Sequence, residues 1–123
     1  MYCPKQFFAQ ILIVVASLAI LSACGAESED EDIDDGVVTV AIVDNDFEPE
    51  ELTVEVGTTV RWVNEGMMMH TVTSGPDATE DGLFDSGDMR NGDTFEYTFD
   101  EAGEFPYFCR PHPMTMRAMV IVE

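Results

Sequence analysis

Short stretches of alternating apolar and polar residues dominate this chain after position 36, and they limit the folds that it can adopt. In the stretch 58–64, Val60 and Trp62 share one face and Arg61 lies on the other. Apolar residues do not recur at helical spacing over any long segment. The stretches 52–56 and 93–99 also alternate, and 37–43, 71–73, 104–109 and 118–122 are further short stretches of β-type composition. Seven or eight short strands at this spacing predict an all-β fold, a Greek-key antiparallel β-sandwich.

Residues 1–23 have a different character and predict export. They carry one Lys, no acid and an apolar run from Phe7 to Leu21. The run is short for a membrane span and is typical of a signal peptide. It ends in Leu21-Ser22-Ala23-Cys24, which resembles a bacterial lipobox in which Cys24 is lipidated; a short uncleaved anchor is the alternative. We therefore expect an exported cell-envelope lipoprotein, anchored by lipid at the periplasmic or outer face of a membrane.

Acidic residues set the character of the next segment and of the whole chain. Residues 24–36 include seven acids between Glu27 and Asp35 and have almost no apolar content, which predicts a disordered acidic tether. The formal net charge of the chain is −20. Nucleic acid is disfavoured as a partner, because binding to it needs Lys and Arg. The charge is compatible with solubility, high salt or docking to a basic partner.

One turn-like segment near the C-terminus, 107–116, gathers soft and borderline donor atoms. Cys109 is followed by His112 and then by Met116, and prolines on both sides of His112 exclude a helix. Because Cys3 precedes the domain and Cys24 would carry lipid, Cys109 has no disulfide partner. A lone thiol in an oxidising compartment is either buried and inert or bound to a metal. The neighbouring donors favour the metal.

The other histidine of the chain, His70, follows the three residues Met67–Met69. Since loops cluster at the ends of a β-sandwich, we expect His70 to meet the Cys109 segment. A thiolate, two imidazoles and a weak thioether form the ligand set of a blue-copper electron-transfer site. Zinc is the rival metal, since one Cys and two His can hold it with an open fourth position, but zinc gains nothing from a methionine.

Residues 37–123 resemble the cupredoxins, particularly the plastocyanin, amicyanin, pseudoazurin and halocyanin group. At the start the resemblance rests on Phe47-Glu48-Pro49 and on the stretches 52–57 and 60–64, and at the end on the stretches 103–112 and 116–122. It implies a cupredoxin-like copper-binding domain that holds one type 1 copper ion.

The resemblance also implies which residues bind copper. His70 and His112 would supply imidazole and Cys109 the thiolate. Met116 would be the axial ligand, because the last strand follows it directly, as in the family. Met114 and Met119 are the alternatives.

The function that the resemblance implies is one-electron transfer, in which copper alternates between Cu(II) and Cu(I) and no substrate is turned over, so the protein would not be an enzyme. Electrons would pass through His112 to and from redox partner proteins, which we expect to dock near His112 and Met67–Met69 on a monomer. The three methionines also favour an alternative, a copper-handling module for storage or delivery, or a second Cu(I) site. A metal-free adhesion or docking domain is a third hypothesis.

We expect most of the other residues singled out by the sequence to support the fold and not to bind the metal. Asn64 and Thr71 flank the His70 segment, and we expect them to tie the two ligand loops together through backbone hydrogen bonds. Ordinary turn or strand roles are the alternative for both. The aromatic side chains of Trp62, Phe95, Tyr97 and Phe99 are expected in the core.

Overall fold

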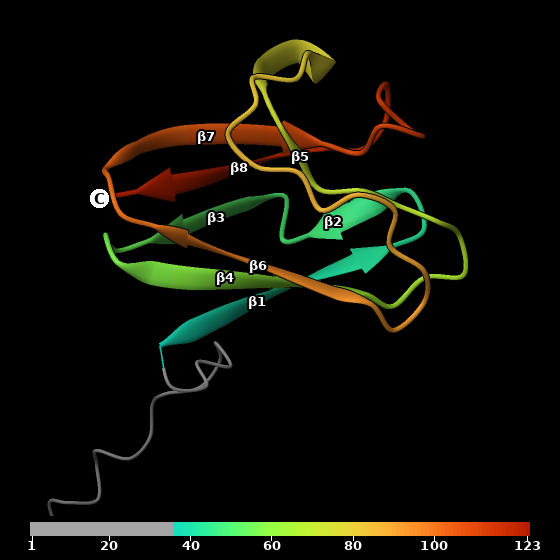
Figure 1. Ribbon diagram of the computed structural model, residues 1–123, viewed down its shortest axis with the longest axis horizontal. Coiled ribbons are helices and arrows are strands. Elements are labelled where there is room, and N and C mark those ends of the chain that lie inside the picture. The colour runs from blue at the N-terminus through green and yellow to red at the C-terminus, as the bar shows by residue number, and fades with distance from the viewer. Residues whose placement is uncertain (1–35) are drawn as a thin grey trace, which may run out of the picture. The chain divides into compact units, whose positions relative to one another are not determined.

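The computed structural model describes residues 36–123 (Figure 1), so the predicted signal peptide, Cys24 and all but the last residue of the tether lie outside the described residues. The described part is all-β, as predicted, apart from one 3-10 turn. No helix in this part is long and apolar enough to cross a membrane. The elements in chain order are β1 Val37–Val43, β2 Asp46–Glu48, β3 Glu51–Val54, β4 Thr58–Asn64, β5 Thr73–Ser74, η2 Pro76–Ala78, β6 Thr94–Phe99, β7 Gly103–Phe108 and β8 Arg117–Val122.

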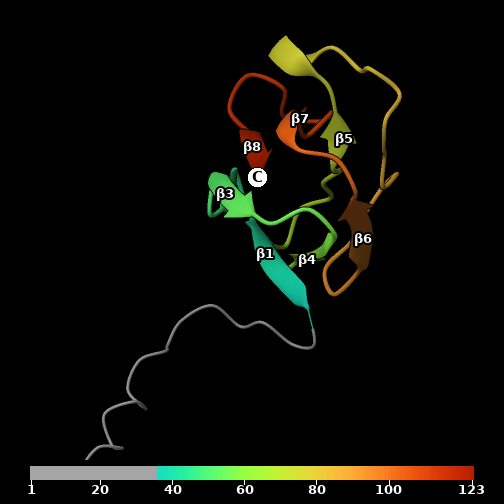
Figure 2. The ribbon, with the colours of Figure 1, turned by 90° about the vertical axis from the view of Figure 1, so that its left-hand side faces the viewer.

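Two four-stranded sheets form a sandwich. One sheet has the order β2-β1-β4-β6 and the other β3-β8-β7-β5. The two layers are visible in the turned view of Figure 2, where β3, β8, β7 and β5 lie on one side and β1, β4 and β6 on the other. Alternating residues of each strand point between the layers, where the apolar faces of the strands are buried or partly buried.

The sheets are mixed, whereas the sequence predicts antiparallel pairing throughout. β1 and β4 pair in parallel, and so do β3 and β8. The reason is that the chain crosses to the other sheet at β3 between β1 and β4, and so returns in the direction of β1. Ile42 is the register partner of Asn64, which brings the ends of β1 and β4 together.

Aromatic side chains fill the space between the sheets. Trp62, Tyr107 and Phe99 are almost fully buried, with the Trp62 and Tyr107 ring centroids 5.4 Å apart. Burying a large apolar side chain stabilises a fold by roughly 1.5–3 kcal/mol. Phe95 and Tyr97, expected in the core, are only partly buried and pack against it. Phe84, from the long segment after β5, completes the cluster, which the sequence does not predict.

The turn between β1 and β2 is tight. Asp46 already begins β2, so only Asp44 and Asn45 connect the strands. Asn45 has a φ of 80°, in the left-handed region that Asn tolerates better than most residues. This tight turn places the Asp44 side chain at the end of the sandwich where β4 also ends.

Candidate metal centre

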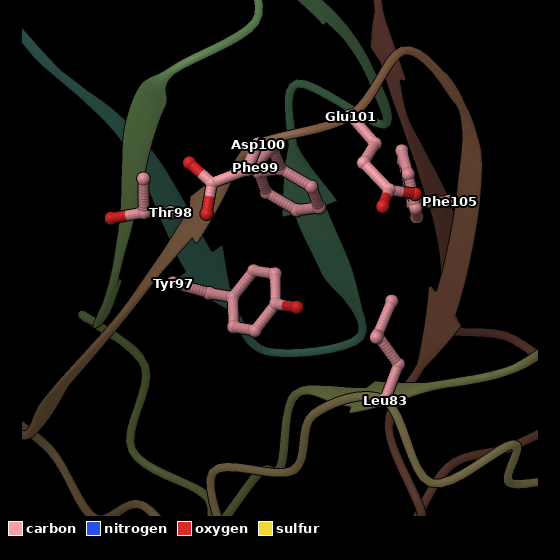
Figure 3. Close-up of a pocket in the computed structure, with 7 residues that line it drawn as sticks. All are labelled: Leu83, Tyr97, Thr98, Phe99, Asp100, Glu101 and Phe105. Carbon is pink, nitrogen blue, oxygen red and sulfur yellow. The ribbon is translucent and has the colours of Figure 1, made fainter.

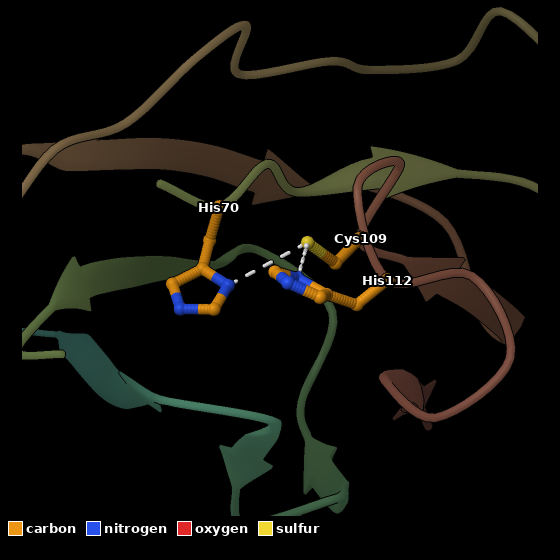
Figure 4. Close-up of side chains that lie close together, drawn as sticks. All are labelled: His70, Cys109 and His112. Atoms are coloured by element: carbon orange, nitrogen blue, oxygen red, sulfur yellow. Dashed lines mark hydrogen bonds between the residues drawn. The ribbon is translucent and has the colours of Figure 1, made fainter. Parts of the chain in front are cut away.

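His70, Cys109 and His112 lie together, as predicted, at one end of the sandwich (Figure 4). The Sγ atom of Cys109 is 3.6 Å from Nδ1 of His70 and 3.5 Å from Nδ1 of His112. The two imidazole ring centroids are 5.1 Å apart. Two nitrogens with the same position in their rings therefore face one sulfur, from segments separated by 39 residues.

The three side chains differ in exposure. His70 and Cys109 are fully buried, whereas His112 is half-buried. Cys109 follows the last residue of β7, and His112 lies on the loop between β7 and β8. His112 is therefore the one member of the trio that reaches towards the surface.

Asn64, the last residue of β4, holds the segment before His70. Its side-chain amide donates to the carbonyl oxygens of Met68 at 3.0 Å and Met89 at 2.8 Å, and its Oδ1 accepts the Gly66 amide at 2.9 Å. Met89 also exchanges two backbone hydrogen bonds with His70. Asn64 thus ties the His70 segment to the segment that contains Met89, and not to the Cys109 loop as expected.

Asp44 is a neighbour of His70 that the sequence analysis missed, because it stands in an ordinary turn pattern. Its Oδ1 lies 3.3 Å from Nε2 of His70, on the side of the ring opposite the thiol. The carboxylate also accepts the amides of Met68 at 3.0 Å and Met67 at 3.2 Å. These two amides, Met68 first, and then the His70 imidazole hold the pKa of Asp44 below its ordinary value.

The Cys109 loop is held largely by hydrogen bonds between its own backbone groups. The His112 amide donates to the Cys109 carbonyl at 3.1 Å, and the Met116 amide donates to the His112 carbonyl at 3.0 Å. The Cys109 amide in turn donates to the Met116 carbonyl at 3.1 Å. The loop is therefore a compact turn with its own hydrogen-bond network.

Thr71 links the two segments, as expected. Its Oγ1 accepts the Arg110 amide at 2.9 Å, and its own amide points at the Cys109 sulfur at 3.5 Å. One residue therefore fixes the spacing between the His70 segment and the thiol. Such outer contacts orient metal ligands and tune their chemistry.

Arg110 anchors the outside of the loop to the segment after β5. Its guanidinium donates to Asp85 at 2.9 Å and to Glu80 at 3.1 Å. Partial burial of Asp85 opposes ionisation, but hydrogen bonds from Gly87 and Thr73 and the Arg110 charge hold the pKa of Asp85 below its ordinary value. The loop is thus braced from two sides, by Thr71 inside and by Arg110 outside.

Burial raises the pKa of the Cys109 thiol, and hydrogen bonds from the amides of Thr71 and His112 only partly oppose the rise. In the metal-free protein the thiol is therefore kept neutral. A bound cation reverses this balance, since a coordinating thiol is deprotonated outright.

The three methionines that compete for the axial position have different surroundings. Met116 is fully buried and belongs to the same core cluster as Cys109, whereas Met114 is 80% exposed. Met119 lies within β8, half-buried and paired with Pro106. Of the three, only Met116 is fully buried in the core.

The donor atoms fit a soft transition metal. One ion can span donors 3.5–3.6 Å apart, because metal–nitrogen and metal–sulfur bonds are about 2.0 and 2.3 Å long. The donors that lie together are one thiol and two imidazoles, and the Met116 thioether is buried in the same core as Cys109. This donor set fits the copper that the sequence predicts better than it fits zinc, because zinc does not favour a thioether ligand.

A separate cavity of about 200 Å³ lies at the opposite end of β7 (Figure 3). Its lining combines apolar side chains with two carboxylates and contains no thiol or imidazole; the residues are Leu83, Tyr97, Thr98, Phe99, Asp100, Glu101 and Phe105. The metal donors and this cavity are therefore distinct features of the domain.

Comparison with known proteins agrees with the geometry. The family described as copper binding proteins, plastocyanin/azurin family, matches residues 35–123. Amicyanin of Paracoccus denitrificans is 36% identical over 92 residues, covering 75% of this chain and 70% of that protein. Amicyanin of Paracoccus versutus is 32% identical over 123 residues, covering 90% of this chain and 92% of that protein. A purple cupredoxin structure from Nitrosopumilus maritimus superposes with a TM-score of 0.65 at 31% identity, covering 69% of this chain and 98% of that one.

Proposed function

The chain belongs to the plastocyanin/azurin family of copper-binding proteins, and from this premise we propose that it is a type 1 copper protein that carries single electrons and is not an enzyme. The observation that carries the proposal is the buried thiol of Cys109 with Nδ1 of both histidines within 3.6 Å. When bound, copper supplies a one-electron couple between Cu(II) and Cu(I).

In this proposal His70, Cys109 and His112 would hold the copper, with the thioether of Met116 as a further, weaker ligand. Thiolate and thioether favour Cu(I), whereas imidazole accepts both oxidation states. The hydrogen bonds of Asn64, Thr71 and the loop backbone keep the donors in one arrangement whether the ion is oxidised or reduced. A fixed arrangement keeps the reorganisation that accompanies electron transfer small.

Redox partners dock, we propose, on the surface around His112. His112 is the half-buried ligand, and four methionines close to the ligands in sequence are exposed, with Met67 at 85%, Met68 at 42%, Met69 at 40% and Met114 at 80%. Flexible, polarizable methionine side chains suit a surface that must accept more than one partner. The net charge of −20 favours partners with basic docking surfaces. The protein acts as a monomer in this proposal.

The proposed location is the cell envelope. A signal peptide at 1–23, lipid on Cys24 and an acidic tether at 24–36 would hold the copper domain at the periplasmic or outer face of a membrane. The support is the sequence pattern alone.

Copper storage or delivery is the second candidate function. The exposed side chains of Met67, Met68 and Met69 favour it, since thioethers bind Cu(I). A delivery protein would release its copper to a chelator on reduction, whereas an electron carrier keeps copper through repeated cycles.

Visible spectroscopy of the purified full chain, loaded with Cu(II), tests the proposed function. We expect an intense absorption that disappears on reduction and returns on reoxidation with the copper retained. Cys109→Ser should abolish the absorption while the far-UV circular dichroism stays that of a β-sandwich. A colourless wild type, or copper that moves to a chelator on reduction, would reject the carrier.

Two methionine variants test the axial position. Met116→Leu should keep copper but shift the reduction potential, because the axial ligand tunes this potential. Met114→Leu is the matched control and should leave it unchanged, since Met114 is largely exposed. The opposite pattern would assign the axial role to Met114.

A further inference from the structure

Asp44 stands on the far side of the His70 ring from the thiol. Its Oδ1 is 3.3 Å from Nε2 of His70, while Nδ1 of the same ring faces the Cys109 sulfur at 3.6 Å. A carboxylate only accepts hydrogen bonds, so Nε2 must carry the proton in this contact. The Nδ1 lone pair is then free to bind a metal.

The position of Asp44 follows from the sheet. β1 and β4 run in parallel with Ile42 opposite Asn64, so the residues two positions further on, Asp44 and Gly66, also come together. The backbone continues this contact, because the Glu65 amide donates to the Ile42 carbonyl at 2.9 Å. Asp44 is therefore carried to the His70 segment by a long-range strand pairing.

Gly66 provides the space that the carboxylate occupies. A Cβ atom at position 66 would lie 2.3 Å from Oδ1 and 2.9 Å from the backbone nitrogen of Asp44. Any other residue at position 66 would push Asp44 away. The Asp44 carboxylate thus occupies the space that a side chain at position 66 would fill.

The carboxylate is also fixed in direction. Its two oxygens accept the amides of Met67 and Met68 at 3.2 and 3.0 Å. The Asp44 side chain is 35% exposed, whereas that of His70 is fully buried. Asp44 is therefore the charged group that touches this buried ring.

We propose that Asp44 is a positioning residue for the metal centre: it holds His70 in the tautomer that offers Nδ1 and makes this imidazole a stronger donor to Cu(II). The inference rests on the proposed function. A carboxylate behind a ligating histidine raises the basicity of the ring, and loss of such a partner costs about 10- to 100-fold in metal affinity. The negative charge stabilises Cu(II) more than Cu(I), so it lowers the reduction potential.

Asp44→Asn is the first test, since it removes the charge but keeps one of the two oxygens as a hydrogen-bond acceptor. We expect Cu(II) affinity to fall about 10- to 100-fold. A tenfold loss confined to Cu(II) would raise the potential by about 59 mV. Asp46→Asn is the matched control: it removes the same charge two residues further on, at the start of β2, where Asp46 accepts the Phe47 amide and does not contact His70.

Gly66→Ala is the second test, because it displaces the carboxylate without changing the charge of the chain. It should shift the potential in the same direction as Asp44→Asn. In the double variant the two shifts should not add, since both remove one contact. Should Asp44→Asn fail to fold, Gly66→Ala carries the test.

Nitrogen-15 NMR of metal-free protein at one neutral pH gives a readout without copper. The wild type and Asp46→Asn should show His70 protonated at Nε2, and Asp44→Ala, which has no acceptor in this place, should show a loss of this preference. Equal potentials for Asp44→Asn and Asp46→Asn, with an unchanged tautomer in Asp44→Ala, would overturn the proposal for Asp44. If the wild type shows this tautomer but forms no blue copper centre, the proposed function is rejected, while the contact between Asp44 and His70 is supported.

Discussion

The segment before His70 and the loop from Cys109 to Met116 meet at one site but are held in different ways. The His70 segment is fixed by side chains from other elements, namely Asn64 at the end of β4 and Asp44 after β1. The Cys109 loop is fixed mostly by hydrogen bonds between its own backbone groups. Thr71 is the contact through which the two segments are joined.

The two segments also differ in how far they expose their metal-binding side chains. His70 is fully buried, and the Asp44 carboxylate contacts its ring on the side away from the thiol. The Cys109 loop carries His112 towards the surface. In the proposed function, the His70 segment would tune the metal and the Cys109 loop would give electrons a route to a partner.

Removal of each imidazole should have the largest effect and should separate the two sides most clearly. His70→Gly and His112→Gly should each lower copper affinity at least about 100-fold, since a lost ligand costs more than a lost outer partner. Added imidazole should restore the visible absorption only in His112→Gly, because His112 is half-buried and His70 is fully buried.

An imidazole titration followed by visible spectroscopy measures this difference. Equal rescue of both variants would show that the His70 side is open to solvent. Absence of rescue in both, with the fold intact, would contradict an accessible His112 position.

Asn64→Ala should have the next largest effect, confined to the His70 side. It leaves the Met68 carbonyl and the Gly66 amide without this partner, whereas the Met89 carbonyl keeps the His70 amide, and a buried unsatisfied group costs about 1–3 kcal/mol. We expect the free energy of unfolding to fall by about 3 kcal/mol, as measured by denaturant titration of the metal-free protein.

Asn91→Ala is the matched control for this variant. Asn91 donates one hydrogen bond to the same segment, to the Gly66 carbonyl at 2.9 Å, but it is exposed. Its loss should cost no more than about 1 kcal/mol. Similar costs for the two variants would mean that the His70 segment does not depend on Asn64.

Asp85→Asn should have the smallest effect and tests the outer brace of the Cys109 loop. The folded-state pKa of Asp85 is lowered, so its carboxylate stabilises the fold above the pH at which the unfolded chain titrates, about 4. The contribution at pH 7 should be below about 1 kcal/mol, because the side chain is 42% exposed.

The sign of the pH dependence is fixed by the direction of this shift. The stability difference between wild type and Asp85→Asn should be present near pH 7 and should vanish as the pH falls through the folded-state pKa. Asp100→Asn, at the other end of β7, corrects for the general relief of repulsion in a chain of charge −20. A difference that grows on acidification would contradict the role of Asp85.

Much of the fold follows from local pattern. β1 and β4 have the predicted limits, and most other predicted strands differ by a few residues, because alternation with a period of two is a local property. The two parallel pairings were not predicted, since they join strands that are separated in the chain by strands of the other sheet. The position of Phe84 in the core was missed for a similar reason, because it lies in a polar segment without periodicity.

The Cys109 loop was predictable because its donors, prolines and spacing lie within one short segment, and its hydrogen bonds close within that segment. The sequence also gives the net charge and the two histidines, and it predicts that both histidines meet one thiol. Only the tertiary structure brings Asp44 to His70, through the parallel β1–β4 register and the space at Gly66. No local pattern encodes that contact, because hydrogen bonding between strands depends on which strands become neighbours and not on the residues of either strand alone.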